Sequence, residues 1–311
     1  MNHDQESHDH DGYGTGGIES RFLLSLGLTG LIFFAELVGG LLTGSLALLS
    51  DAAHVFFDAF ALALSYVAIR LASLPPNERH TYGYHRLRVL AALVNGASLL
   101  VVAFEIFREA ITRFSNPEPV LAGPMLVVAV IGLVVNLVVA FVLGGHDHED
   151  LNVRSAFLHV LGDALASVGV IVAGIIILLT GWTLIDPLIS LLIAVIILVG
   201  SGNVLRRSLH ILVEGVPRGM TANDVAQAMN GVDGVTEVHD LHIWTVSPGF
   251  ISLSAHVVLD DQSLSEAQEI MDDLKTTLAE RFGIEHTTIQ VECQSCAEGT
   301  LICPYEVNDH D

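Results

Sequence analysis

Long apolar stretches alternate with short polar breaks through the first two thirds of the chain. Six of these stretches lie at 22–42, 46–73, 87–112, 120–143, 155–180 and 184–205. An α-helix needs about 20 apolar residues to cross the hydrocarbon core of a bilayer, and lipid offers no hydrogen-bond partner to an open backbone. The pattern therefore predicts six transmembrane helices in an α-helical membrane protein.

A different pattern begins after about Ser208. Its segments are a short helix at 221–231, strands at 235–246 and 250–260, a helix at 264–282 and a strand at 286–292. Apolar and polar residues alternate along the second strand, which is typical of a half-buried strand. The second helix gathers its apolar residues on one face. The order αββαβ predicts a small α+β domain.

These patterns divide the chain into four parts. We expect a tail at 1–20, a six-helix transmembrane domain at 21–208, a C-terminal domain at 209–292 and a cysteine-containing tail at 293–311. The first tail contains His3, His8 and His10 among acidic residues and lacks the basic start and apolar run of a secretory signal. Its polar composition predicts disorder, and its histidines are suited to weak capture of metal ions.

Composition supports a membrane protein and argues against nucleic acid as a partner. The chain is 51% hydrophobic and only 15% charged, whereas soluble domains carry about 25% charged residues. The net charge of −22 argues against binding to nucleic acid, whose phosphates need Lys and Arg. Residues 210–311 hold 18 acidic and 3 basic residues. Three cysteines near the C-terminus do not make a disulfide scaffold.

Arginine positions predict the orientation in the membrane. If the six helices alternate in direction, eight arginines lie near the ends on one side: Arg21, Arg70, Arg79, Arg86, Arg88, Arg154, Arg206 and Arg207. Arg108 and Arg113 lie on the other side. Because basic residues are concentrated on the cytoplasmic side of membrane proteins, we expect both termini in the cytoplasm of an inner or cell membrane.

Two identical polar motifs interrupt the second and fifth apolar stretches. His54 precedes Asp58 by four residues, and His159 precedes Asp163 by four, so each helix presents an imidazole and a carboxylate on one face. Ionisable groups at membrane depth are costly and usually mark ion pathways. One such pair could equally hold two helices together, but two matching pairs favour one shared site.

Such a set of side chains is suited to a divalent metal. Two nitrogens and two oxygens form a tetrahedral set that suits Zn²⁺, and two carboxylates balance its charge. Without metal, two carboxylates in a poorly solvated place repel each other and take up protons, and metal binding displaces protons from its ligands. The motifs therefore predict competition between a metal ion and protons, which is the requirement for an antiporter.

The paired motifs, together with the segments Gly44–Asp51, Arg79–Gly83 and His239–Trp244, resemble the cation diffusion facilitator family, in particular its zinc-preferring bacterial and animal members. The resemblance covers residues 20–292. It implies a homodimeric, proton-coupled zinc exporter with a ferredoxin-like cytoplasmic domain. It also implies that His54, Asp58, His159 and Asp163 form the transport site, and that a histidine at the first of these positions accompanies zinc preference.

The resemblance further implies a cytoplasmic metal site made of His239, His256 and Glu292. On the residues alone, histidines on a half-exposed sheet are more often solvated or hydrogen-bonded than ligands. Gln290 stands where some relatives have a histidine, which argues against a second metal ion there. His80 matches one ligand of a loop site found in some relatives, but Tyr84 replaces the second histidine.

Three other residues have competing interpretations. Cys293 and Cys296 form a CxxC motif that could bind zinc with two further ligands or could be reduced thiols in a flexible end. Asp51 could line the ion pathway or cap its own helix. Asp186, directly before Pro187, is expected to cap the sixth helix. Further polar residues within the apolar stretches are Glu36, Asn95, Glu105, Asn136 and Ser167.

Other classes of membrane protein fit the sequence less well. An ATP-driven pump is disfavoured because Lys275, the only lysine, lacks the glycine-rich phosphate-binding loop. An intramembrane metalloenzyme is disfavoured because the chain has no HExxH motif and catalytic zinc keeps an open coordination position. A membrane zinc sensor or buffer without transport remains the alternative. The expected partners are zinc ions, protons, membrane lipid and a second copy of the chain.

Overall fold

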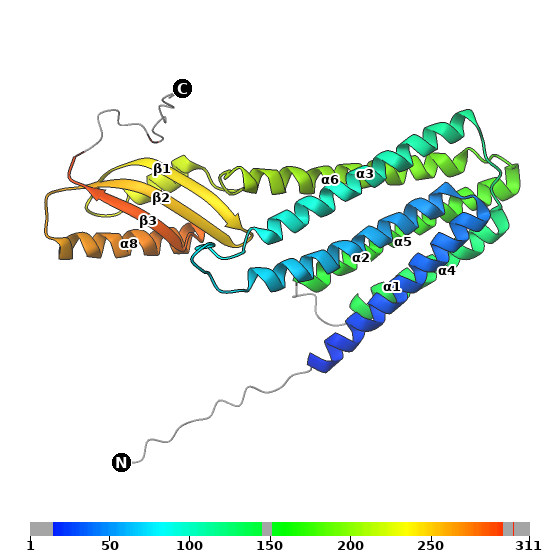
Figure 1. Ribbon diagram of the computed structural model, residues 1–311, viewed down its shortest axis with the longest axis horizontal. Helices are drawn as coiled ribbons and strands as arrows, with labels where there is room; N and C mark the ends of the chain where they lie inside the picture. Colours follow the sequence, from blue (N-terminus) through cyan, green and yellow to red (C-terminus); the bar gives the residue numbers. More distant parts are fainter. Residues whose placement is uncertain (1–14, 145–150, 295–300, 302–311) are drawn as a thin grey trace, which may run out of the picture. The chain divides into compact units, whose positions relative to one another are not determined.

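The computed structural model describes residues 15–144, 151–294 and 301, with side chains for 27–141, 161–294 and 301. Its first two thirds form six long helices (Figure 1): α1 Thr15–Thr43, α2 Leu46–Ala72, α3 Leu87–Ser115, α4 Ala122–Gly144, α5 Leu151–Thr180 and α6 Ile185–Leu212. All six predicted apolar stretches are helical. The largest differences are at α1, which begins seven residues earlier than predicted, and α6, which ends seven residues later.

The apolar helices are those of an integral membrane protein. Among the described residues, five helices are long and apolar enough to cross a bilayer, and α1 contributes a shorter apolar segment, Gly27–Thr43. Many large apolar side chains on these helices point outward, among them Phe34, Phe104 and Phe141. Exposed apolar side chains on every helix are stable only if lipid surrounds the bundle.

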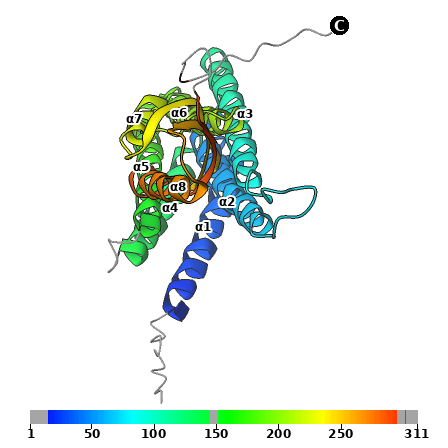
Figure 2. The same ribbon diagram turned by 90° about the vertical axis from the view of Figure 1, so that its left-hand side faces the viewer.

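The helices and the C-terminal part pack as two units. The first comprises residues up to Phe60 together with 98–201, and the second comprises 61–97 and 202 onward. In the first unit α4 packs along α5, and α1 packs on α4 (Figures 1 and 2). Glycines allow this close approach: a Cβ on Gly39 of α1 would lie 2.8 Å from Val128, and one on Gly174 of α5 would lie 2.7 Å from Leu126.

Asp186 caps a different helix from the one predicted. Since α6 begins at Ile185, Asp186 lies inside its first turn, and its carboxylate accepts hydrogen bonds from the start of α2 instead. The donors are the Ser45 hydroxyl at 2.6 Å and the backbone N–H groups of Leu46 at 2.7 Å and Ala47 at 3.3 Å. A carboxylate favours a helix N-terminus because it satisfies unpaired N–H groups there.

The C-terminal domain has the predicted order of elements. They are α7 Ala222–Asn230, β1 Val235–Ser247, β2 Phe250–Leu259, α8 Leu264–Phe282 and β3 His286–Glu292. The sheet order is β1-β2-β3, with β1 antiparallel and β3 parallel to β2. Capping boxes begin α7 at Thr221 and α8 at Ser263. Gly283, with φ +65°, ends α8, as the left-handed conformation favours glycine.

One face of this sheet carries the domain's hydrophobic core. Leu253, Ala255 and Val257 of β2 pack with Met229 of α7 and Leu274 of α8. Because side chains alternate along a strand, the residues between them on β2, including His256, face away from this core. The face opposite the helices is therefore available for polar chemistry.

Candidate metal centres

The structure brings three of the four predicted membrane ligands together. His54 Nε2 lies 3.5 Å from Asp58 Oδ2 on the same helix and 3.8 Å from Asp163 Oδ1 on α5. Ligand atoms of all three residues lie within 4.8 Å of one another. Asp163 is buried and the other two are partly buried. One nitrogen and two oxygens at this spacing are a set that a single zinc ion can hold.

His159 is the fourth predicted ligand. It lies in α5, four residues before Asp163. The side chain of His159 lies outside the described residues. The local reason for the arrangement is helical periodicity: both motifs repeat a spacing of four inside uninterrupted helices, α2 and α5.

Two more carboxyl groups lie in the same unit. Glu36 of α1 and Asp51 of α2 are 1% and 2% exposed. Since Asp51 is in the second turn of α2 and buried, it does not cap that helix. Asn136 and Ser167 also lie buried, and the Asn136 amide donates to Ser167 Oγ at 3.5 Å. In the sequence, Glu36 is a single acidic residue within an apolar stretch, and no pattern predicts which residue it contacts.

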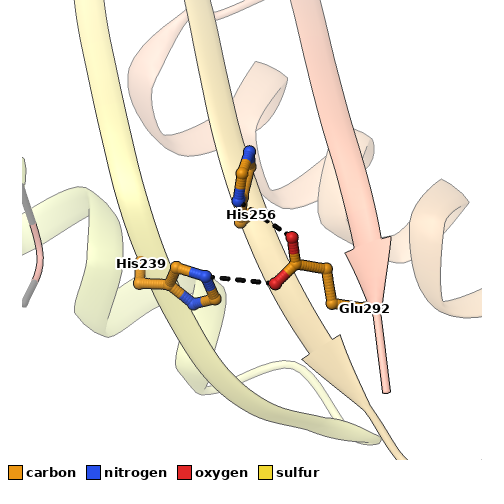
Figure 3. Close-up of side chains that lie close together, drawn as sticks. All are labelled: His239, His256 and Glu292. Carbon is orange, nitrogen blue, oxygen red and sulfur yellow. Dashed lines mark ion pairs between the residues drawn. The ribbon is translucent and has the colours of Figure 1, made fainter. Parts of the chain in front are cut away.

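A second group of ligand atoms lies on the face of the C-terminal sheet opposite its hydrophobic core. The Glu292 carboxylate of β3 lies close to a histidine of β1 and a histidine of β2 (Figure 3): its Oε2 is 3.2 Å from His239 Nε2, and its Oε1 is 3.0 Å from His256 Nδ1. His239 is 1% exposed. The ligand atoms of the triad lie within 4.8 Å of one another.

Strand register produces this triad. His239 of β1 is paired with His256 of β2, which is paired in turn with Gln290 of β3, two residues before Glu292. The β1–β2 register shifts between His239 and His242, and Asp240 within the shift has φ +49°. The Asp240 carboxylate lies 3.1 Å from His242 Nε2 and 3.7 Å from His256 Nε2, and His242 is not one of the three residues of the triad. Bulges often re-aim side chains at functional sites.

The remaining predicted ligands do not join a metal cluster in the described part of the chain. His80 is exposed in the loop between α2 and α3, where its ring lies 4.5 Å from that of Tyr84. Gln290 Nε2 donates to Glu292 Oε1 at 2.8 Å. Cys293 is exposed and reduced, and Cys296 lies outside the described residues.

Residues 22–213 match the sequence pattern of the cation efflux transmembrane domain, which covers α2 to α6 in full and with them both His-x-x-x-Asp motifs. The chain belongs to the cation efflux family. Residues 217–294 of this cation efflux protein match the pattern of the family's cytoplasmic domain. The name of this pattern refers to dimers. The family resemblance expected from the motifs is therefore confirmed.

Relatives of this cation efflux protein carry names that refer to metal transport. The cadmium, cobalt and zinc/H⁺-K⁺ antiporter of Bacillus subtilis is 44% identical over 84% of each chain. The metal cation efflux system protein CzcD of Cupriavidus metallidurans is 41% identical over 94% of this chain and 91% of its own. The zinc transporter ZitB of Pectobacterium atrosepticum is 40% identical over 98% and 94%, respectively.

Solved structures also match part of this cation efflux protein. One of them is the metal-bound C-terminal domain of the CzcD transporter from Cupriavidus metallidurans, which is 40% identical in sequence. The match covers 24% of this chain and 99% of that one, with a TM-score of 0.22.

Proposed function

We propose that this protein exports Zn²⁺ from the cytoplasm in exchange for protons. The observation that carries the proposal is the convergence of His54, Asp58 and Asp163 within 4.8 Å inside apolar helices. His159 is proposed as the fourth ligand of a His₂Asp₂ site between α2 and α5, one helical turn from Asp163. Ionisable groups are costly at membrane depth, so such a cluster is expected at an ion pathway.

The chemistry of the site accounts for coupling to protons. Zn²⁺ and two carboxylates form a neutral complex, whereas the metal-free site leaves two negative charges close together. Protons that bind His and Asp relieve this repulsion, and zinc must displace them from its ligands. A site that faces each side of the membrane in turn then moves zinc one way and protons the other.

We further propose the arrangement in the membrane. All six helices, α1 included, span the bilayer, with both termini on the cytoplasmic side of the inner or cell membrane. The domains are those predicted from the sequence: a tail at 1–20, a transmembrane domain at 21–208, a ferredoxin-like cytoplasmic domain at 209–292 and a tail at 293–311. Two copies of the chain associate through the cytoplasmic domain, as the name of its family pattern suggests.

The cytoplasmic triad supports a second role for zinc. His239, His256 and Glu292 offer two nitrogens and a carboxylate within hydrogen-bonding distance of one another, which leaves one position of a tetrahedral zinc site for a further ligand. We propose that zinc bound there regulates export. A membrane zinc sensor or buffer without transport would use the same triad, and only flux separates the two functions. Enzymatic catalysis is not part of the proposal.

Zinc flux in proteoliposomes tests the transport function. The purified full-length protein is reconstituted, a pH gradient is imposed and ⁶⁵Zn²⁺ uptake is measured. We expect Asp58→Ala and Asp163→Ala to reduce uptake to that of empty liposomes, because each removes a proposed ligand. Asp273→Ala, an exposed acid on α8, is the control and should transport like the parent. Full activity in either ligand variant would refute the site, and zinc binding without flux in the parent would favour the sensor.

A further inference from the structure

A cavity of about 1060 Å³ lies within the second unit of the chain, between the loop that joins α2 to α3 and strand β1. Residues 79–87 form one part of its wall, and residues 241–244 of β1 form another. Its lining includes none of the residues of the two metal-ligand groups described above. Small ligands bind in clefts of roughly 300–1,000 Å³, so this cavity is large enough for a small molecule or a lipid headgroup.

Hydrogen bonds hold the loop between α2 and α3 in a defined shape. The backbone N–H groups of Asn77 and His80 each donate to the carbonyl oxygen of the other at 3.1 Å. The Asn77 side chain also accepts a hydrogen bond from the backbone N–H of Arg79 at 3.0 Å. The ring of His85 packs edge-on against that of Phe250 on β2, with the ring centres 5.3 Å apart. The wall of the cavity is therefore preformed, which lowers the entropic cost of binding a ligand.

The cavity gathers positive charge beside a part of the chain that is strongly acidic. Residues 210–311 hold 18 acidic and 3 basic residues, whereas the cavity is lined by Arg79 and Arg86 and by a single acid, Glu214. Three histidines also line it: His80, His85 and His242. The lining therefore favours an anion over a cation.

The two arginines keep donors available for such an anion. Arg86 Nη2 donates to Glu214 Oε1 at 2.9 Å, which uses one of the five N–H groups of a guanidinium. Among the residues that the structure describes, no carboxylate is paired with the Arg79 guanidinium. Guanidinium groups bind phosphate through parallel N–H···O hydrogen bonds, so the cavity offers donors that match a phosphate group.

The position of the loop brings it near a source of phosphate groups. It connects α2, which ends at Ala72, to α3, which begins at Leu87, and both helices are long and apolar enough to cross a bilayer. The loop therefore lies at a membrane surface, where phospholipid headgroups are concentrated. The lining of the cavity continues onto α3 at the exposed side chain of Leu90, which gives it an apolar edge beside the charged one.

We propose that this cavity binds a phosphate group, carried by an anionic phospholipid headgroup or present as free phosphate, and that Arg79 and Arg86 hold it. The site is separate from both proposed zinc sites, so the inference goes beyond the proposed function and does not depend on it. The competing explanation is general attraction between basic residues near a membrane and any anionic surface. Such attraction would depend equally on Arg88, which is exposed at the start of α3 and does not line the cavity.

Trp244 lines the cavity and can report binding, because Trp182→Phe removes the only other tryptophan of the chain. The full-length protein in this background, in detergent micelles, is titrated at constant ionic strength with inorganic phosphate and, separately, with phosphatidylglycerol added to the micelles. We expect a saturable change in fluorescence. Saturation with phosphatidylglycerol alone identifies a lipid headgroup as the ligand, and saturation with inorganic phosphate identifies free phosphate.

Three charge variants test the residues of the site. Arg79→Gln should weaken binding roughly tenfold, the loss expected for one charge-assisted hydrogen bond, and Arg88→Gln should bind like the parent. Glu214→Gln should bind several-fold more tightly, because it removes an opposing charge and frees Arg86. A gain in affinity cannot come from a misfolded loop, so this variant covers the case that the arginine variant is disturbed.

Three results would overturn the inference. The first is the absence of a saturable change with either probe. The second is an equal loss of affinity in Arg79→Gln and Arg88→Gln, which would indicate general attraction to anions. The third is unchanged or weaker binding in Glu214→Gln, which would show that the ligand does not contact the guanidinium of Arg86.

Discussion

Asp186 is the residue that joins three helices of the membrane domain. Its carboxylate accepts hydrogen bonds from the start of α2 and lies 3.9 Å from the guanidinium of Arg113 on α3. Arg113 in turn donates to the carbonyl oxygen of Gly44, just before α2. Since α2 carries His54 and Asp58, these contacts position the helix that presents half of the proposed transport site.

Removal of this carboxylate is expected to destabilise the membrane domain strongly. Asp186→Ala leaves the Ser45 hydroxyl and the first N–H groups of α2 without their buried acceptor, and a buried donor left unsatisfied costs about 1–3 kcal/mol. The matched control is Glu118→Ala, since Glu118 is an exposed partner of the same Arg113 at 3.0 Å and exposed pairs contribute about 1 kcal/mol or less. Thermal denaturation of the detergent-solubilised protein compares them. Equal melting temperatures would show that Asp186 contributes no more than a surface charge.

Side-chain spacing predicted some of these residues and not others. The two motifs with a spacing of four identify His54, Asp58 and Asp163 because helical periodicity is local. The burial of Glu36 and Asp51 depends on the rotation and height of neighbouring helices against one another, which no local pattern specifies. The prediction that Asp186 caps α6 is wrong for the same reason: its carboxylate accepts a hydrogen bond from Leu46, 140 residues earlier in the chain, and a contact over that distance leaves no local pattern.

At the scale of elements, close helix packing depends on glycines. A Cβ at Gly174 would overlap Leu126 of α4 at 2.7 Å, whereas one at Gly169, also on α5, would make an ordinary contact with Ile189 at 3.5 Å. Small residues allow membrane helices to approach closely. The sequence showed that these glycines lie in apolar stretches but not which of them faces a neighbouring helix.

A pair of alanine substitutions tests this packing. Gly174→Ala should destabilise the protein by about 1 kcal/mol, because overpacking costs about 1–3 kcal/mol and alanine returns about 0.5–1 kcal/mol of helix propensity. Gly169→Ala should be neutral or stabilising. The fraction of monodisperse protein after heating in detergent, measured by size-exclusion chromatography, compares the two. A Gly174→Ala variant as stable as Gly169→Ala would contradict the packing of α4 on α5.

The capping box of α8 predicts how the C-terminal domain responds to acid. The Ser263 hydroxyl and backbone N–H donate to the Glu266 carboxylate at 2.7 and 2.9 Å, which lowers the pKa of Glu266 below its ordinary value. A lowered folded-state pKa stabilises the fold above the unfolded-state pKa, and this contribution is lost as pH falls through the folded-state pKa. As pH falls, the stability of Glu266→Gln should therefore decrease less than the stability of the parent.

Urea unfolding of the full chain, followed by Trp244 fluorescence in a Trp182→Phe background, measures this effect. Ser263→Ala should cost about 1 kcal/mol at neutral pH through loss of the N-cap. Glu269→Gln, an exposed acid on the same helix, serves as the control and should keep the acid dependence of the parent. If Glu266→Gln and Glu269→Gln respond to pH alike, the capping box does not govern the acid response of α8.

At the scale of the whole molecule, hydrophobicity predicted the order of elements and sequence motifs predicted the family. Alternation along strands and periodicity along helices are visible within ten to twenty residues, so every predicted helix and strand is present. The cytoplasmic triad was expected only from family resemblance, because it depends on the register of three strands. A register shift separates His239, whose Nε2 lies 3.2 Å from Glu292 Oε2, from His242.

The triad is expected to bind zinc independently of the membrane site. His256→Ala should remove one class of zinc site in calorimetry of the full-length protein and leave the protein able to transport. His242→Ala is the control, because His242 is ion-paired with Asp240 and is not one of the three residues of the triad. Unchanged zinc stoichiometry in His256→Ala would argue against a metal site on the sheet, and complete loss of flux would place the triad on the transport pathway.

The most direct test of metal and proton exchange is zinc movement driven by a pH gradient alone. Proteoliposomes with an acidic interior are placed in a solution with equal zinc on both sides, and internal zinc is followed over time. The proposed site predicts that zinc accumulates inside against its own gradient, that accumulation stops when a proton ionophore collapses the pH difference, and that Asp163→Ala shows none. Zinc that only equilibrates, at a rate unaffected by the pH difference, would contradict the exchange of zinc for protons at this site.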